Sequence, residues 1–280
     1  MATPVIKRRA HGASITQQTV TTVEEFISAV ASFTNPHGSI WYRGHSKESH
    51  RLIPSIYRMT IIKPEDELRR LEEKMNRRFR DRSMPHSFQG RDESSDVSEL
   101  QSWWRLFTMQ HYGTPTRLLD WSENALTALC FAVFGAAENA TEDAVVWMLD
   151  PCNWNNIGNS NHAHPLSVDE HGAGPYAPLP SSNQHVQAAW PLAVYGMHNS
   201  PRIITQQGTF VVFPPGKATS MEEHAITNGD RGISALKAIK LHRDSIKDIA
   251  SVLRKLGFAQ SSLYPDLHGL SADLKKDFGY

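Results

Sequence analysis

The chain has little cysteine: its 280 residues include two, Cys130 and Cys152. Two thiols cannot cross-link a chain of this length into a disulfide scaffold, and there is no CxxC pair to suggest a zinc site. No apolar run of about 7–15 residues follows the basic residues near the start, so we expect no signal peptide. The longest apolar stretch, residues 125–137, is too short to span a bilayer. We therefore expect a cytoplasmic protein with no membrane partner.

Net charge is also absent, because 29 Lys and Arg residues balance 29 Asp and Glu residues. A neutral balance argues against a uniformly basic nucleic-acid binder, although a local basic patch stays compatible with it. The motifs GxGxxG, P-loop, HExxH and GxSxG are missing. Histidines gather between residues 162 and 171, but in a segment rich in Asn and Gly, and we predict no metal site there.

With 40% apolar residues, the chain can bury a core. We predict a flexible N-terminal arm over residues 1–20 and a single domain over 21–280. Periodicity and capping signals predict helices from 22, 64, 95 or 96, 123, 243 and 266, and strands over 39–45, 144–149, 202–205, 209–213 and 233–241. Residues 151–190 read as a loop. Because helices and strands mix without a regular βαβ rhythm, we expect an α+β fold with a mixed central sheet flanked by helices.

One unusual segment is Trp41-Tyr42-Arg43-Gly44-His45. It places a guanidinium on a predicted strand among apolar neighbours. A buried Arg needs an anionic partner, and its fork suits phosphate or carboxylate. Gly44 would let a backbone or a ligand approach closely. Two interpretations stay open: Arg43 binds a ligand, or it pairs internally, with Asp120 as one candidate.

The second unusual segment runs from Gln110 to Ser122 and is predicted to join two helices. A loop so rich in hydrogen-bond donors and aromatic rings could hold an aromatic ring and a phosphate together. The alternative is a structural turn in which Asp120 and Ser122 cap the following helix. The residues that attract attention are His111, Tyr112, Thr114, Thr116, Arg117, Asp120 and Trp121.

These segments resemble the FRG-domain family, which is named for an aromatic-Arg-Gly motif that Tyr42-Arg43-Gly44 matches. The resemblance extends from about residue 22 to 276 in fixed order, which implies one FRG-like domain over 21–280. By itself it implies no reaction. Its further motifs are Gln110–Gly113, Thr116–Trp121, Val146-Trp147, Arg202-Ile203, Gln206–Phe210, Leu263–Leu267 and Gly269-Leu270.

The order of motifs is also similar to that of ADP-ribosyltransferases, which would make NAD the substrate. That similarity implies that Arg43 binds an NAD phosphate and that Tyr112 or Trp121 stacks on nicotinamide. It further implies that His111 holds the ribose with Thr114 or Thr116, and that Gln207 orients the acceptor or the 2′-hydroxyl. The implied catalytic residues are Arg43, His111, Asp120 and Gln207; the implied cofactor-binding residues are Tyr42, Gly44, His45, Tyr112, Thr114, Thr116, Arg117 and Trp121.

The chain departs from the transferase pattern at Thr205-Gln206-Gln207-Gly208, which contains no glutamate. Asp120 or Glu123 would then have to supply the carboxylate that stabilises the oxocarbenium-like transition state. Our leading hypothesis is an ADP-ribosyltransferase or NAD glycohydrolase, acting as a toxin or phage-defence effector on a protein or nucleic-acid acceptor, with an antitoxin as a fitting partner.

Two alternatives to this hypothesis stay open. The first is a nucleotide- or nucleic-acid-binding module without catalysis. In it Arg43, Arg117, Arg202 and the arginines of 77–82 contact phosphates, and Trp and Tyr rings stack on bases. The second is an RNase with His111 as general base, Arg43 on the phosphate and His45 as the acid.

Overall fold

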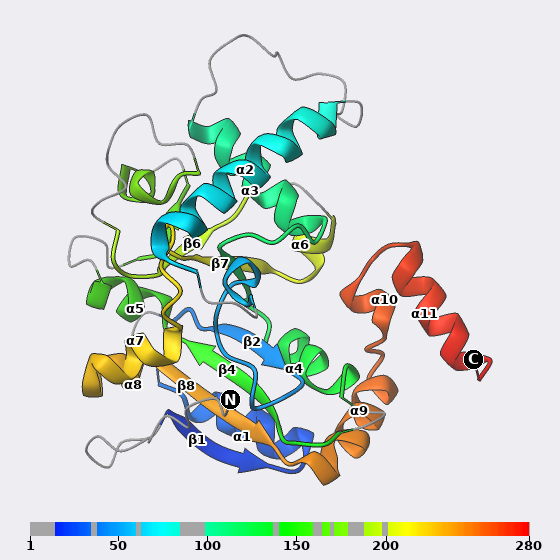
Figure 1. Ribbon diagram of the computed structural model, residues 1–280. Helices are drawn as coiled ribbons and strands as arrows, with labels where there is room; N and C mark the ends of the chain where they lie inside the picture. Colours follow the sequence, from blue (N-terminus) through cyan, green and yellow to red (C-terminus); the bar gives the residue numbers. More distant parts are fainter. Residues whose placement is uncertain are drawn as a thin grey trace.

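The computed structural model describes residues 15–34, 38–59, 63–84, 99–136, 140–158, 164–168, 171–178, 188–197 and 201–279. Its centre is an eight-stranded mixed sheet in the order β1-β8-β4-β2-β3-β7-β6-β5 (Figure 1). Only the outer pairs β1–β8 and β5–β6 are parallel. The strands are β1 (Thr16–Val20), β2 (Trp41–His45), β3 (Leu118–Ser122), β4 (Ala144–Leu149), β5 (Leu166–Ser167), β6 (Leu192–Tyr195), β7 (Gly208–Val212) and β8 (Leu236–Leu241).

Helices cover the sheet and confirm the predicted α+β class. They are α1 (Val23–Ser32), α2 (Glu65–Ser83), α3 (Glu99–His111), α4 (Ala125–Phe134), α5 (Pro151–Gly158), α6 (Pro201–Thr205), α7 (Met221–Thr227), α8 (Gly229–Ala235), α9 (Ile246–Lys255), α10 (Gln260–Leu263) and α11 (Leu267–Asp277). Within these residues, no helix is long and apolar enough to cross a bilayer.

The two faces of the sheet carry different cores. Helices α1, α4 and α9 pack on strands β4 and β8 through an aliphatic cluster that includes Phe26, Leu129 and Ile249. The opposite face carries a tryptophan-rich cluster that includes Trp41, Trp121 and Trp147. Because successive strand residues alternate between faces, the register decides which residues of the two unusual segments can meet.

Helix α4 lies directly against β2, and glycine makes this possible. A Cβ on Gly44 would lie 1.9 Å from the main-chain oxygen of Ala128 and 2.7 Å from the nitrogen of Ala132. The close approach that Gly44 was predicted to allow is therefore filled by the backbone of α4.

Several predicted elements are confirmed. Helix α1 begins after Thr22, whose hydroxyl accepts a hydrogen bond from the main-chain nitrogen of Glu25 at 3.2 Å. Strands β2 and β4 and helices α2, α4, α9 and α11 lie within two or three residues of their predicted ranges. The caps predicted at Ser95 or Asp96 lie outside the described residues.

The segment 110–122 is different from its prediction as a connection between two helices. Its last five residues form β3, which pairs with β7 from Leu118–Val212 to Ser122–Gly208. The next helix is capped by Asn124, whose side chain accepts from the main-chain nitrogens of Leu126 and Thr127. The predicted capping by Asp120 and Ser122 is therefore wrong, because both residues lie within the strand.

Residues 202–205 were predicted as a strand and instead form most of α6. The β-branched residues Ile203, Ile204 and Thr205 favour a strand locally. Pro201, at the first helical position, suits a helical turn, and the chain must reverse here before β7 begins at Gly208. The position of the turn therefore prevails over local propensity.

Three further boundaries differ from prediction. Helix α5 occupies the start of the predicted loop 151–190, and α8 replaces the first part of the predicted strand 233–241. Residues 16–20 were predicted as the end of the flexible arm. They form β1 instead, the edge strand of the sheet, which pairs in parallel with β8. Residues 1–14 lie outside the described part of the chain.

Candidate functional site

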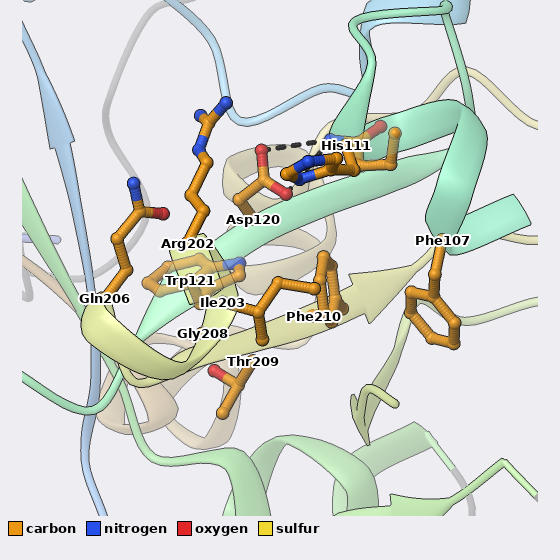
Figure 2. A pocket seen from close by; sticks show the side chains of 11 residues that line it. Phe107, His111, Asp120, Trp121, Arg202, Ile203, Gln206, Gly208, Thr209 and Phe210 are labelled. Carbon is orange, nitrogen blue, oxygen red and sulfur yellow. Dashed lines mark hydrogen bonds between the residues drawn. The ribbon is translucent and has the colours of Figure 1, made fainter. Parts of the chain in front are cut away.

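A cleft opens where α3, β3, α6 and β7 meet (Figure 2). It holds about 400 Å³, its open mouth included. The enclosed part measures only about 40 Å³, room for a few water molecules, so the cleft is shallow and mostly open to solvent. The lining residues are Phe107, Gln110, His111, Asp120, Trp121, Arg202, Ile203, Gln206, Gly208, Thr209 and Phe210.

Asp120 supplies the carboxylate of the cleft. Its side chain is exposed, and both oxygens accept hydrogen bonds from Gln110 Nε2, at 3.0 and 2.9 Å. The amide oxygen of Gln110 accepts in turn from the hydroxyl of Thr116. This chain of bonds fixes the orientation of Gln110 and holds the carboxylate while leaving it open to the cleft.

His111 lies beside this carboxylate at the end of α3 (Figure 2). Burial lowers the pKa of the imidazole, the Arg202 guanidinium lowers it further, and Asp266 opposes them. The ring is therefore neutral at pH 7. Its Nδ1 is buried and has no hydrogen-bond partner among the described residues.

Helix α6 supplies the third side of the cleft. Gln206 donates from Nε2 to the main-chain oxygen of Leu263 at 2.6 Å, and its own main-chain oxygen accepts from the Ser122 hydroxyl at 2.6 Å. The guanidinium of Arg202 lies over the ring of Tyr264, 4.6 Å from its centroid. These contacts tie the C-terminal segment to the cleft.

Arg43 lies behind the cleft rather than in it. In the described strands, β2 pairs with β3 at one position, Tyr42 with Ser122, and the strands then separate. Arg43 fills this gap, donating from Nη1 to the main-chain oxygen of Asp120 and from Nε to His45 Nε2 at 3.1 Å. Burial lowers its pKa to about 10, while the Asp120 charge opposes that shift.

His45 is committed to this same cluster. Because Nε2 accepts from Arg43, the proton is on Nδ1, which donates to the main-chain oxygen of His50 at 3.2 Å. Burial, and then the Arg43 charge, lower the pKa of His45 to about 2. The imidazole is therefore neutral throughout the physiological range.

Arg117 is fully buried and has its partners inside the protein. It forms an ion pair with Glu72 at 2.5 Å and donates to the main-chain oxygens of Phe213, at 2.9 Å, and Tyr176. Thr116 is also buried, between Gln110 and the main-chain nitrogen of Leu118. Both residues support the cleft from beneath and offer nothing to a ligand in this structure.

Other predicted site residues are dispersed. Tyr42 is buried in the aliphatic core on the α4 side of the sheet. Tyr112 is 67% exposed just beyond α3, with its ring against His111. Thr114 is half-buried, and its main-chain nitrogen donates to Met109 in the turn. Trp121 lines the cleft, but its indole is only 3% exposed and belongs to the tryptophan-rich core.

Gln207 lies at the turn between α6 and β7. Its φ is +47°, a left-handed conformation that non-glycine residues rarely adopt. Its main-chain oxygen accepts from the nitrogen of Glu123 at 3.0 Å, while its exposed side chain does not line the cleft. The preceding residue, Gln206, takes the place in the cleft that was expected of Gln207.

Three polar cleft residues were not among the predicted catalytic or cofactor-binding residues: Gln110, Arg202 and Gln206. Arg202 was named only in the binding-module alternative, as a phosphate contact. All three belong to motifs that carry the family resemblance, so the motifs pointed to the correct segments. Assigning the individual side chains required the helical geometry of residues 201–205, which the sequence did not indicate.

Comparison with family models gives one match. Residues 38–141 match the model described as the FRG domain. The chain carries an FRG domain. No curated protein and no solved structure matches the chain.

The FRG match covers part of the cleft. Arg43, Gln110, His111 and Asp120 lie inside the matched range, and Arg202, Gln206 and Tyr264 lie beyond it. The cleft is therefore formed jointly by the FRG domain and by C-terminal segments of this chain.

Proposed function

We propose that this FRG-domain protein consumes NAD⁺ by breaking the bond between nicotinamide and ribose, and transfers ADP-ribose to water or to a macromolecule. The observation that supports this proposal is the position of Asp120. The transferase-like turn at 206–207 has no acidic residue, yet the cleft beside it contains the Asp120 carboxylate together with Gln206. Glu123, the other candidate for this role, is exposed and is not among the lining residues.

The charges of the cleft complement the substrate. NAD⁺ has a cationic nicotinamide ring and an anionic pyrophosphate, and the cleft offers the Asp120 carboxylate and the Arg202 guanidinium. As the C1′–N bond breaks, its electron pair leaves with nicotinamide and positive charge develops on the ribose. A carboxylate held beside that ribose stabilises the charge. Neutral His111 can accept the proton of the attacking hydroxyl.

The RNase alternative loses support at His45. Both ring nitrogens are hydrogen-bonded within the protein, and a pKa of about 2 leaves no proton to donate at neutral pH. A nuclease would need another acid. The role as a toxin or phage-defence effector rests on the family resemblance alone.

The test is to measure nicotinamide release from NAD⁺ by the purified protein, with and without cell extract. We expect Asp120→Asn to lower the rate about 10²- to 10³-fold, as the loss of one stabilising group in a transition state does. The substitution keeps an acceptor for Gln110, so the fold should persist. Glu123→Gln is the matched control, three residues along the chain, and should retain the wild-type rate.

Label transferred from NAD⁺ identifies the acceptor. Label that protease removes would indicate a protein acceptor, and label that nuclease removes a nucleic acid. If the wild-type protein binds NAD⁺ but releases no nicotinamide under any of these conditions, the binding-module alternative replaces the proposal. Equal rates for Asp120→Asn and wild type would remove Asp120 from the mechanism.

A further inference from the structure

The motif Leu263–Leu267 has no role in the reaction proposed above, although it was singled out in the sequence. In the structure, three of its residues each act on a different residue of the cleft. Leu263 accepts the hydrogen bond from Gln206, Tyr264 lies under Arg202, and the charge of Asp266 acts on His111. The segment therefore supports three residues of the cleft, although none of its own residues is among those that line it.

The segment is fixed to the body of the protein at its start. Leu263 is 2% exposed and belongs to the aliphatic core beneath α4. Tyr264 contacts Phe131 of α4 edge-on, with ring centroids 5.9 Å apart. Helix α10 contacts α6, and Figure 1 shows α11 continuing outward from α10 to the C-terminus. The Tyr264 ring is thus held in place independently of α11.

Arg202 differs from the other arginines around the cleft. Within the described part of the chain, its guanidinium makes no hydrogen bond and no ion pair. It lies over the face of the Tyr264 ring, and its charge acts on His111. A cation stacked on an aromatic ring keeps its N–H groups free at the edge of the guanidinium plane. Figure 2 shows the side chain extending along the cleft near Asp120 and His111.

We infer that Arg202 is the anion-binding residue of the cleft, that Tyr264 is its positioning residue, and that the ligand group is a phosphate. The planar fork of Arg binds phosphate oxygens in pairs. Taking the ligand to be a nucleotide diphosphate rests on the proposed function. The similarity to ADP-ribosyltransferases implied Arg43 for this role, but its Nε and one Nη1 hydrogen already bond to His45 and to the Asp120 main chain.

Binding of ADP-ribose and of inorganic pyrophosphate, measured by calorimetry, tests the inference without requiring turnover. We expect Arg202→Gln to weaken both affinities about 10- to 100-fold, as expected for lost hydrogen bonds to a charged group. Arg254→Gln is the matched control: Arg254 also lies over an aromatic ring, Phe134, at 5.1 Å, but outside the cleft. It should bind both probes as the wild type does.

Two substitutions at Tyr264 separate positioning from packing. Tyr264→Phe keeps the ring and should retain wild-type affinity. Tyr264→Leu removes the ring and should weaken ADP-ribose binding about 2- to 5-fold, as the loss of one exposed cation–π contact does. Adenosine, which lacks phosphate, should compete with ADP-ribose equally in both variants, whereas general damage to the cleft would change its binding too.

The outcomes distinguish this inference from the proposed function. Loss of ADP-ribose binding in Arg202→Gln, with no nicotinamide release by the wild type, would support the phosphate site and overturn the reaction. Nicotinamide release with unchanged binding in Arg202→Gln would overturn the phosphate site and leave the reaction standing. Failure of the wild type to bind either phosphate probe would also overturn the inference.

Discussion

Three arginines around the cleft have the same chemistry but different surroundings. Arg117 is saturated by one carboxylate and two main-chain oxygens, Arg43 bridges two strands, and Arg202 has N–H groups to spare. A guanidinium whose donors are already bonded cannot exchange them for a ligand without leaving buried carbonyls unpaired. The surroundings therefore assign Arg117 to stability and Arg202 to recognition.

The buried pair of Arg117 and Glu72 gives a prediction about stability. Arg117→Met should lower the free energy of unfolding by about 3–5 kcal/mol, because it leaves the Glu72 carboxylate buried without its partner. The double variant Arg117→Met with Glu72→Met should recover part of that loss. Urea denaturation of the three proteins measures both effects; a double variant that is less stable than the single would contradict this account.

At the scale of secondary-structure elements, β2 and α4 pack closely against each other at Gly44. Gly44→Ala should lower the free energy of unfolding by at least about 2 kcal/mol, because strand and helix must separate to admit the Cβ. Gly135→Ala, at the end of the same helix, is the control. Its added Cβ would meet nothing nearer than 3.7 Å, and φ is −74°. Thermal unfolding should show a large decrease for the first and almost none for the second.

The elements that local patterns predicted well are those whose patterns agree with their surroundings. Helices α1 and α9 have an apolar stripe and a clear start or end, and β4 is a continuous apolar run. Strand β3 was missed because Asp120 and Ser122 in Leu118–Ser122 resemble a polar turn. The reason for its polar residues is that they face the cleft and the α6 turn, which no local pattern reveals.

The same reason limited the prediction of the site. The sequence identified the segments 41–45, 110–122 and 202–208, and Asp120 and His111 do line the cleft. Side chains alternate between the two faces of the sheet along β2 and β3, so Tyr42 and Trp121 lie in the cores on opposite faces. The helical turn at 201–205 places Arg202 and Gln206 in the lining of the cleft. These placements depend on strand register and on α6, and neither follows from residue types.

For the molecule as a whole, the histidines link folding to pH. Burial lowers the pKa of His45, His111 and His224, so none of these groups gains a proton readily in the native state. In the unfolded chain each titrates near pH 6.5. Below that pH the unfolded chain binds protons that the native protein does not, and native stability decreases as the pH falls.

His45 should dominate this effect, since its pKa is about 2 in the native protein. From pH 6.5 down to about pH 2 it should remove up to about 1.4 kcal/mol of stability per pH unit, or about 2 kcal/mol by pH 5. His45→Asn keeps an acceptor for Arg43 and a donor for the His50 carbonyl but cannot titrate. The free energy of unfolding should be measured by urea denaturation at pH 7.5, 6.0 and 5.0. Its slope against pH should be smaller for the variant, by the equivalent of about one proton bound on unfolding. Carboxylates elsewhere contribute equally to both proteins, so identical slopes would show that His45 becomes protonated in the folded state and that its cluster with Arg43 opens in acid.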